Sequence, residues 1–431
     1  MAAKTMGVGL LGLGTVGGAV AASLQAQADA YERRAGVRFT VVKALVRDPG
    51  KQRTAQLLSL PLTKDPEDVL TDPSIQIVVE LMGGEEPAYT LMQRALSSGR
   101  HVVTANKEVI AKRGTQLRAL AAKHGVSLRY EASVGGGIPV IATLQRDLLA
   151  NDIVAVTAII NGTTNYILTR MAQEGLDFGE ALAQAQALGY AEADPRNDVE
   201  GIDAAYKLAI LSALAFRTEV AFEGVYHEGI SRLAARDFTY ANELGYTVKL
   251  LAIARRTAAG LQTRVHPAFL PHQEPLSKVD GVFNAIQIEG DLSGRVLLQG
   301  RGAGAGPTAS AVIADLLEVG RSHGAAPPAD IESGSAIPAL PMEALKTRYY
   351  VRMSVTDQPG VLARVALIFG EERISIASVL QKEVDEHAGT AELVIMTHHA
   401  AEGDMLKALR RIGELEVVSE IGNMVRVEDQ A

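Results

Sequence analysis

The chain has 431 residues, of which 47% are hydrophobic and 21% are charged, and its formal net charge is -8. This length accommodates two or three domains with full cores, and the acidic balance gives no general attraction to nucleic acid. Cysteine is absent, which excludes disulfides, cysteine-ligated metals and thiol nucleophiles, and with them the aldehyde dehydrogenases that form a thiohemiacetal. We expect a cytoplasmic protein that binds no membrane, because the sequence has neither a signal-peptide pattern nor a membrane-length apolar run.

The first predicted element is a strand at Met6–Leu11, which leads into a glycine-rich turn and then a helix. Gly12, Gly14 and Gly17 have the GxGxxG spacing. In that pattern the glycines permit a tight turn, a close approach to a pyrophosphate and tight helix packing, with the phosphate at the helix N-terminus. The pattern favours a dinucleotide site, and the alternative is a purely structural glycine turn.

The next strand, Phe39–Val46, ends at Arg47 and Asp48. An acidic residue at the strand end would select the unphosphorylated cofactor. Because Arg47 comes first, we expect a preference for NADP. If Arg47 merely pairs with Asp48, both NADP and NAD remain usable.

Two more apolar strands are expected at Ile75–Leu81 and His101–Thr104, separated by a helix at Pro87–Ser98. Strands that alternate with helices are typical of a doubly wound parallel sheet, whose ligands lie beyond the carboxyl ends of the strands. Such ends are the positions of Gly83, Thr104, Asn106 and Lys107. We expect Lys107 in a cleft, although a solvated surface lysine is the commoner case.

Three consecutive glycines, Gly135–Gly137, follow Glu131 and bring the backbone close to a neighbour. The Glu131 side chain and nearby carbonyls could supply oxygen ligands for a hard cation, or the segment could be a hinge between domains. A strand at Ile153–Ile160 leads into NGTTN (Asn161–Asn165), in which Thr163, Thr164 and Asn165 suit a helix N-cap or a contact with a cofactor ring.

An acidic stretch between Glu192 and Asp203 contains five carboxylates and could hold an ammonium group. Pro195 and Gly201 predict a non-helical segment before an apolar helix that starts at Ile202. Asp203 and Lys207 are one turn apart on one face of that helix. A buried lysine paired with a carboxylate is a candidate proton carrier, and the alternative is an ion pair on a half-exposed helix.

Two strand-rich segments are expected around Arg264–Leu270 and Val282–Leu298, followed by a glycine-rich turn that opens a helix at Ala311–Gly320. This helix is expected to return to the first domain. Prolines within Ser322–Lys346 predict a linker. The remaining pattern is βαββαβ, a ferredoxin-like unit, with elements at Tyr349–Val355, Val361–Phe369, Ile374–Glu383, Ala391–Thr397, Glu402–Ile412 and Val417–Val427.

The motifs GLGTVG, TANKE, YEASVGGGIP, NGTTNYIL, LGYAEADPRNDVEGIDAAYKL and GAGPTAS occur in this order, and together the chain resembles the homoserine dehydrogenase family with a C-terminal ACT domain. The resemblance implies an α/β protein that interconverts L-homoserine and L-aspartate 4-semialdehyde with NADP or NAD. The implied domains are a Rossmann-type NAD(P)-binding domain at 1–133, an α+β substrate and dimerisation domain at 134–321, a linker at 322–346 and a ferredoxin-like ACT domain at 347–431.

The resemblance also implies roles for particular residues. Lys207 is the implied general acid/base, with Asp203 orienting it and Lys107 as the second catalytic lysine. Glu192 and Asp198 are implied to hold the amino end of the substrate. The cofactor contacts, joined with the glycine pattern and strand end above, are Gly12, Gly14, Thr15, Val16, Gly17, Arg47, Thr104 and Lys107. A monovalent cation, Na+ or K+, is implied at Glu131, Val134, Gly136 and Ile138.

The ACT-like turn contains Asp357 and Gly360, which match a ligand-binding loop. This likeness implies an amino-acid effector, with threonine as the natural candidate, and a homodimeric core that ACT pairing could extend to a tetramer. The alternative is an ACT domain that only dimerises. The predicted linker further implies that deleting the residues after Lys346 leaves catalysis intact. Two rival functions are another dehydrogenase with a trailing ACT domain, such as phosphoglycerate dehydrogenase, and a non-catalytic amino-acid sensor.

Overall fold

The computed structural model describes residues 4–53, 57, 59–322, 337–385 and 389–429. It divides into two compact units, each built from three stretches of chain. The first comprises Met1–Val156, Tyr206–Gly224 and Phe283–Ile337, and the second comprises Thr157–Ala205, Val225–Val282 and Pro338–Ala431. No helix in the described part of the chain has the length and apolar character needed to cross a membrane.

The first unit contains a parallel six-stranded sheet in the order β3-β2-β1-β4-β5-β6. Its central strands are almost wholly apolar and buried, as expected for a parallel sheet covered on both faces. The strands are β1 (Lys4–Leu11), β2 (Val37–Leu45), β3 (Leu62–Thr63), β4 (Ile75–Glu80), β5 (His101–Thr104) and β6 (Leu128–Arg129), and the helices between them are α1 (Thr15–Ala26), α2 (Ala28–Ala35), α3 (Glu67–Leu70), α4 (Ala88–Ser97) and α5 (Lys107–His124). The doubly wound sheet predicted from the sequence is confirmed.

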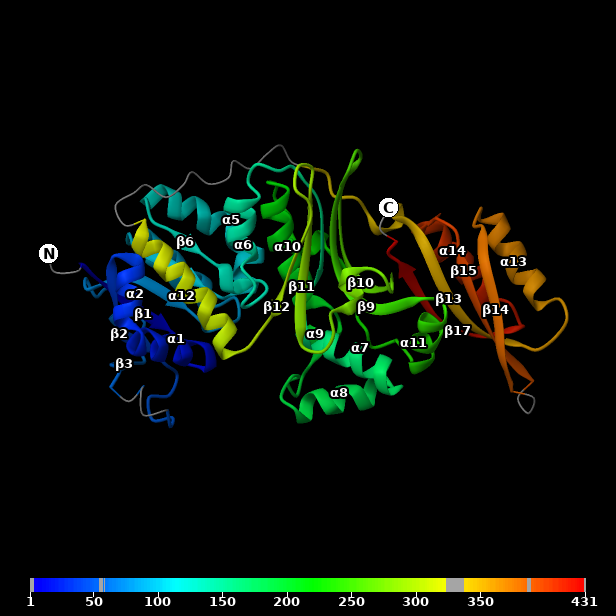
Figure 1. Cartoon of the computed structure of the whole chain (residues 1–431), viewed down its shortest axis with the longest axis horizontal. Coiled ribbons are helices and arrows are strands. Elements are labelled where there is room, and N and C mark those ends of the chain that lie inside the picture. The colour runs from blue at the N-terminus through cyan, green and yellow to red at the C-terminus, as the bar shows by residue number, and fades with distance from the viewer. Residues whose placement is uncertain (1–3, 54–56, 58, 323–336, 386–388, 430–431) are drawn as a thin grey trace. The chain divides into compact units, whose positions relative to one another are not determined.

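Helix α12 (Ala305–Arg321) returns to this sheet and packs beside α1 and α2 (Figure 1). A Cβ on Gly320 would lie 2.6 Å from Val37 Cγ2, so only glycine allows this close approach. The predicted return of the helix is confirmed. It begins six residues before the predicted Ala311, because Pro307 lies in the first turn, where backbone N–H groups have no intrahelical acceptor.

Smaller elements complete the first unit. They are η2 (Glu131–Ser133), α6 (Val140–Ala142), the π-helical turn η3 (Thr143–Asp147), η4 (Phe222–Gly224) and the antiparallel hairpin of β11 (Phe283–Gly290) and β12 (Gly294–Arg301). Strand β7 (Ile153–Ile159) and helix α10 (Ile202–Ala215) each contain the point at which the chain passes from one unit to the other.

The second unit begins with helices and a long antiparallel hairpin. The helices are α7 (Gly162–Glu174), α8 (Phe178–Ala187), α9 (Arg196–Val199) and α11 (Ala235–Glu243), and the strands are β8 (Tyr226–His227), β9 (Tyr246–Thr257) and β10 (Gly260–Pro271), followed by η5 (Pro275–Lys278). The prediction of a non-helical segment before Ile202 was wrong over one turn, because α9 forms directly after Pro195. Proline is tolerated at a helix start, since it needs no N–H acceptor there.

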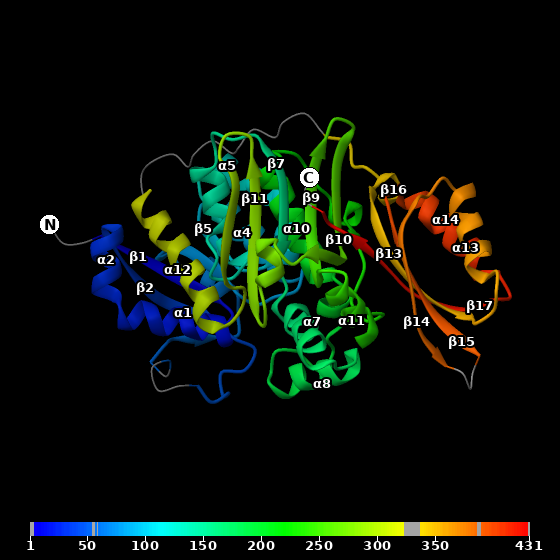
Figure 2. The same ribbon diagram turned by 45° about the vertical axis from the view of Figure 1, so that its right-hand side comes forward.

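The C-terminal part of the second unit has the predicted βαββαβ order (Figure 2). Its strands run in the order β17-β13-β15-β14, and α13 and α14 lie side by side on one face. The elements are β13 (Lys346–Thr356), α13 (Val361–Glu371), β14 (Ile376–Asp385), β15 (Thr390–Thr397), α14 (Glu402–Gly413) and β17 (Val418–Val427), with η6 (Met342–Ala344) and the two-residue β16 (Ala400–Ala401) added. The ferredoxin-like prediction is confirmed.

This ferredoxin-like part is attached to the rest of the second unit by both a strand pair and buried charges. Strand β17 pairs in parallel with β10 at Ala268 and Phe269. Arg352 of β13 forms ion pairs with Asp237 of α11, at 2.7 Å, and with Glu392 of β15, at 3.2 Å. Most of the predicted linker, residues 323–336, lies outside the described residues, but the attachment beyond it is more extensive than a linker implies.

Candidate active site

The glycine turn after β1 has the geometry that the GxGxxG pattern predicts. Gly12 has a φ of +104°, and a Cβ on Gly17 would lie 2.3 Å from Gly12 O, so the third glycine allows α1 to pack against the turn. Nothing lies within 4 Å of a Cβ built on Gly14. Thr15 and Val16 form the first turn of α1, which has no side-chain cap and no acidic residue. Its N–H groups therefore suit the phosphates of a dinucleotide.

The end of β2 supplies the residues expected to choose between cofactors. Arg47 and Asp48 are both exposed. The Asp48 carboxylate accepts a hydrogen bond from Gly50 N at 2.8 Å. It therefore caps its own turn, and this gives no support to the alternative in which Asp48 neutralises Arg47.

At the carboxyl ends of β4 and β5, buried polar groups hold the start of α5. The Thr104 hydroxyl donates to Glu80 Oε2 at 2.6 Å and accepts from Asn106 N at 2.9 Å. Asn106 caps α5 by accepting from Val109 N at 3.1 Å, and Lys107 is the first residue of that helix. The Thr104 side chain is fully buried, so its hydroxyl supports this edge of the sheet.

The segment after Glu131 approaches another turn closely, as its glycines predict. A Cβ on Gly136 would lie 2.4 Å from Gly302 O, and Gly136 has a φ of +55°. The buried Glu131 carboxylate accepts from Ile141 N at 2.9 Å and Ala142 N at 2.7 Å, the first turn of α6. Burial raises the pKa of Glu131. This carboxylate and the glycine-turn carbonyls are oxygen donors of the type that hard cations take.

Two carboxylates of the acidic stretch accept hydrogen bonds from the same side-chain amide, that of Asn161. Asn161 Nδ2 donates to Asp198 Oδ1 at 2.7 Å and to Asp203 Oδ2 at 2.9 Å. Asn161 Oδ1 accepts from Thr164 N at 2.8 Å and so caps α7. A helix does start in NGTTN, but the prediction that Thr163, Thr164 or Asn165 caps it was wrong: Asn161 is the N-cap, and those three residues lie inside α7. Asn161 was missed as a site residue, although its position at a strand-to-helix turn was visible in the sequence.

Asn161 bonds to two of the acidic residues, and Glu192 makes a different contact. Its side chain is exposed, and its backbone carbonyl accepts from Gln186 Nε2 at 3.1 Å. Asp203 and Lys207 are one turn apart in α10 and are 3% and 9% exposed, respectively. Burial at this level contradicts the alternative of an ion pair on a half-exposed helix, and a lysine that is this buried is usually paired with an opposite charge.

The candidate regulatory turn lies between β13 and α13. Gly360 has a φ of +92° and forms the N-cap of α13. Asp357 Oδ1 accepts from Gln381 Nε2 at 3.3 Å, and both Asp357 and Gly360 are exposed. The turn is therefore open to a ligand, and Gly360 adopts a backbone conformation that other residues rarely reach.

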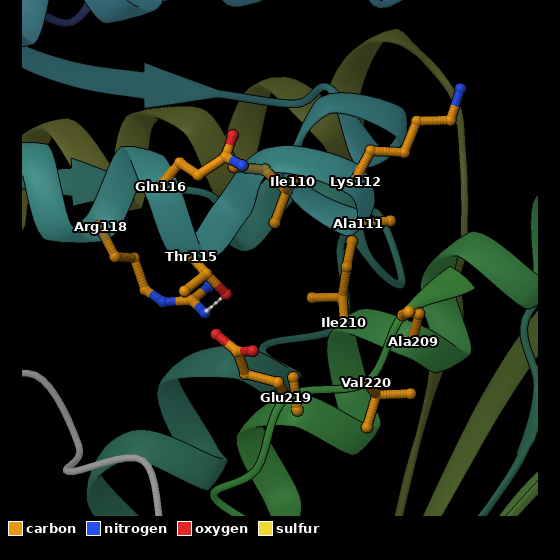
Figure 3. A pocket seen from close by; sticks show the side chains of 12 residues that line it. Ile110, Ala111, Lys112, Thr115, Gln116, Arg118, Ala209, Ile210, Glu219 and Val220 are labelled. Carbon is orange, nitrogen blue, oxygen red and sulfur yellow. Dashed lines mark hydrogen bonds between the residues drawn. The ribbon is translucent and has the colours of Figure 1, made fainter. Parts of the chain in front are cut away.

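A pocket of about 290 Å³ lies between α5 and α10 of the first unit (Figure 3). Arg118 donates to Thr115 Oγ1 at 3.1 Å, and the Glu219 carboxylate points into the same space. None of the catalytic, substrate or cofactor residues predicted from the sequence lines it. This pocket is therefore separate from the residues that the sequence predicts for catalysis and cofactor binding.

Comparison with known proteins agrees with this architecture in three successive segments. Residues 12–131 match the homoserine dehydrogenase NAD-binding domain, residues 139–317 match homoserine dehydrogenase, and residues 349–417 match the ACT domain. The homoserine dehydrogenase of Pseudomonas aeruginosa is 44% identical over 98% of both chains.

Solved structures give the same result. A homoserine dehydrogenase from Thiobacillus denitrificans is 46% identical, covers 99% of both chains and superposes with a TM-score of 0.94. A hyperthermophilic archaeal homoserine dehydrogenase solved with NADPH is 29% identical, has a TM-score of 0.63, and spans 73% of this chain and 97% of its own. The chain therefore belongs to the homoserine dehydrogenase family, and it is an oxidoreductase with a nicotinamide-dinucleotide-binding domain and a C-terminal ACT domain.

Proposed function

We propose that the protein catalyses the reversible NADP-dependent oxidation of L-homoserine to L-aspartate 4-semialdehyde, as a cytoplasmic enzyme of the threonine, methionine and isoleucine branch of amino-acid biosynthesis. The observation that carries this proposal is the buried pair of Asp203 and Lys207 in α10 of a chain of this family. A buried lysine beside a carboxylate suits proton transfer at the reacting hydroxyl.

The nicotinamide ring, when bound, supplies the hydride acceptor. Lys207, in its neutral form, takes the proton from the substrate hydroxyl during oxidation and returns it during reduction. Asp203 orients Lys207, and Asn161 in turn holds the Asp203 carboxylate through its amide. Lys107, at the start of α5, is the second catalytic lysine.

The substrate's ammonium group would be held by carboxylates. Asp198 is already fixed by Asn161, and the exposed Glu192 would supply a second carboxylate. A monovalent cation, Na+ or K+, would take oxygen ligands from Glu131 and from the carbonyls of Val134, Gly136 and Ile138.

The preference for NADP rests on Arg47, whose guanidinium suits a 2′-phosphate. The exposed turn at Asp357 and Gly360 supports an amino-acid effector, and we propose feedback inhibition by threonine there. The assembly we propose is a homodimer that ACT pairing can extend to a tetramer.

The test is the initial rate of NADP reduction by the purified protein with L-homoserine, with NAD in parallel and with threonine added or withheld. We expect homoserine-dependent turnover, faster at low concentrations of NADP than of NAD, and inhibition by threonine. Absence of turnover at neutral and alkaline pH with Na+ or K+ present would favour the amino-acid sensor. Turnover that threonine leaves unchanged would reject the proposed effector.

A further inference from the structure

A buried glutamate ends β4, directly before the turn that faces the glycine loop. Glu80 is fully buried, in a strand that is otherwise apolar apart from Gln76. A carboxylate in such a position is costly unless several donors satisfy it. Its hydrogen bonds therefore indicate what it does.

Glu80 joins two neighbouring strand ends. One carboxylate oxygen accepts from Met82 N at 2.7 Å, and the other accepts from the Thr104 hydroxyl at 2.6 Å. Gly83 N–H adds a further hydrogen bond. Burial raises the pKa of Glu80, while these donors lower it. The carboxylate thus fixes both the turn after β4 and the side chain that ends β5.

The network continues from Thr104 to the first turn of α5. Because the Thr104 hydroxyl gives its proton to Glu80, its lone pair is free to accept from Asn106 N, at 2.9 Å. Asn106 Nδ2 donates to Gly84 O at 2.8 Å, which links the same helix start to the turn after β4. The residue that follows Asn106 is Lys107.

The turn after β4 also contacts the glycine loop. A Cβ on Gly12 would lie 2.9 Å from Leu81 O, so these two backbones are packed without room for a side chain. Any shift of the turn would therefore be transmitted to the loop expected to hold the cofactor phosphates.

We propose that Glu80 is a positioning residue that holds the Met82–Gly84 turn and, through Thr104 and Asn106, the orientation of Lys107. This inference rests on the proposed function for the role of Lys107. The cofactor part of it concerns binding alone and does not depend on homoserine.

The test is Glu80→Gln, which keeps the shape but has one carbonyl oxygen. Glutamine leaves either the Met82 N–H or the Thr104 hydroxyl proton without an acceptor. We expect the Kd for NADPH, measured by cofactor fluorescence, to rise about tenfold, the scale of one charge-assisted hydrogen bond. We also expect kcat to fall, while the KM for homoserine stays within about twofold.

Two further variants make the result decisive. Thr104→Val breaks the same network from the other side, so it should reproduce the loss, and the double variant should lose less than the two single effects combined. If Glu80→Gln does not fold, Thr104→Val alone carries the test. Glu392→Gln is the control for general destabilisation, because Glu392 is another buried glutamate, one that accepts from Tyr240 at 2.6 Å and pairs with Arg352 at 3.2 Å far along the chain.

The outcomes separate the two hypotheses. NADPH affinity and kcat that are unchanged in Glu80→Gln, or changed only as much as in Glu392→Gln, would overturn the positioning role. If the wild-type protein fails to oxidise homoserine, the proposed function fails, and the NADPH titration still decides whether Glu80 supports the cofactor turn.

Discussion

Removing Arg352 should destabilise the second unit strongly, because it leaves a buried carboxylate without its cation. Asp237 is 0% exposed and receives the Arg352 guanidinium at 2.7 Å. Breaking such a buried pair costs about 3–5 kcal/mol. A domain of roughly 200 residues loses about 2–4 °C of Tm per kcal/mol, so Arg352→Ala should lower the Tm of the second unit by roughly 6–20 °C.

The chain offers a matched control for this variant. Arg236 pairs with Glu392 at 3.4 Å, but its side chain is 60% exposed. Such pairs contribute about 0–1 kcal/mol. Thermal unfolding of both variants, followed by circular dichroism, should therefore show a large shift for Arg352→Ala and a small one for Arg236→Ala. Equal shifts in Tm would refute the claim that the buried charges hold the ferredoxin-like part in place.

The same contacts revise the expected effect of truncation. The sequence predicted that removing the residues after Lys346 leaves catalysis intact. That deletion would take away β17, which pairs with β10, and would leave Asp237 buried without Arg352. We therefore expect the truncated protein to lose stability, and point variants in the Asp357 turn are the better test of regulation.

The remaining predictions concern the glycine loop, a buried histidine and the cofactor preference. Gly14→Ala should raise the KM for the cofactor at least about tenfold, because the added Cβ would enter space that a phosphate would use. Its Tm should be unchanged, because nothing lies within 4 Å of that Cβ. Gly17→Ala should instead lower Tm, because its Cβ would lie 2.3 Å from Gly12 O. Burial and the neighbouring arginines lower the pKa of His266 well below its ordinary value. As the pH falls below about 6.5, His266 therefore takes up a proton in the unfolded chain but not in the folded chain. The free energy of unfolding should then fall by up to ~1.4 kcal/mol for each further unit of decrease in pH. Urea unfolding at several pH values should show that the free energy of unfolding depends less on pH in His266→Gln than in the wild type. An identical pH dependence in the two proteins would reject His266 as the group responsible. Arg47→Ala should raise the KM for NADP much more than that for NAD, and equal effects would contradict a role in selecting NADP.

Local patterns predicted most of the fold. The order of elements in the ferredoxin-like part follows from short runs with clear periodicity, and each begins within a few residues of its predicted start. The long strand β9 was not predicted, and neither was the pairing of β17 with β10. Such pairings join residues far apart in the chain, and the sequence pattern of either strand carries no information about its partner.

The sequence predicted those parts of the candidate site whose geometry depends only on the spacing of residues along one helix. Asp203 and Lys207 are one helical turn apart, so their common face followed from the sequence. Asn161 and Glu80 were missed, because their importance arises from hydrogen bonds to residues on other elements. A glutamate inside an otherwise apolar strand was nevertheless a visible signal, since a buried carboxylate requires donors.

The central claim is that Lys207 moves the proton in the interconversion of homoserine and aspartate 4-semialdehyde. The most direct test mixes L-aspartate 4-semialdehyde with NADPH, follows NADPH loss and identifies the product by mass spectrometry, for the wild-type protein and for Lys207→Ala. We expect homoserine from the wild type and a roughly 10²–10⁴-fold slower rate in the variant, with NADPH affinity retained. A different product, or near-normal turnover without Lys207, would contradict the mechanism.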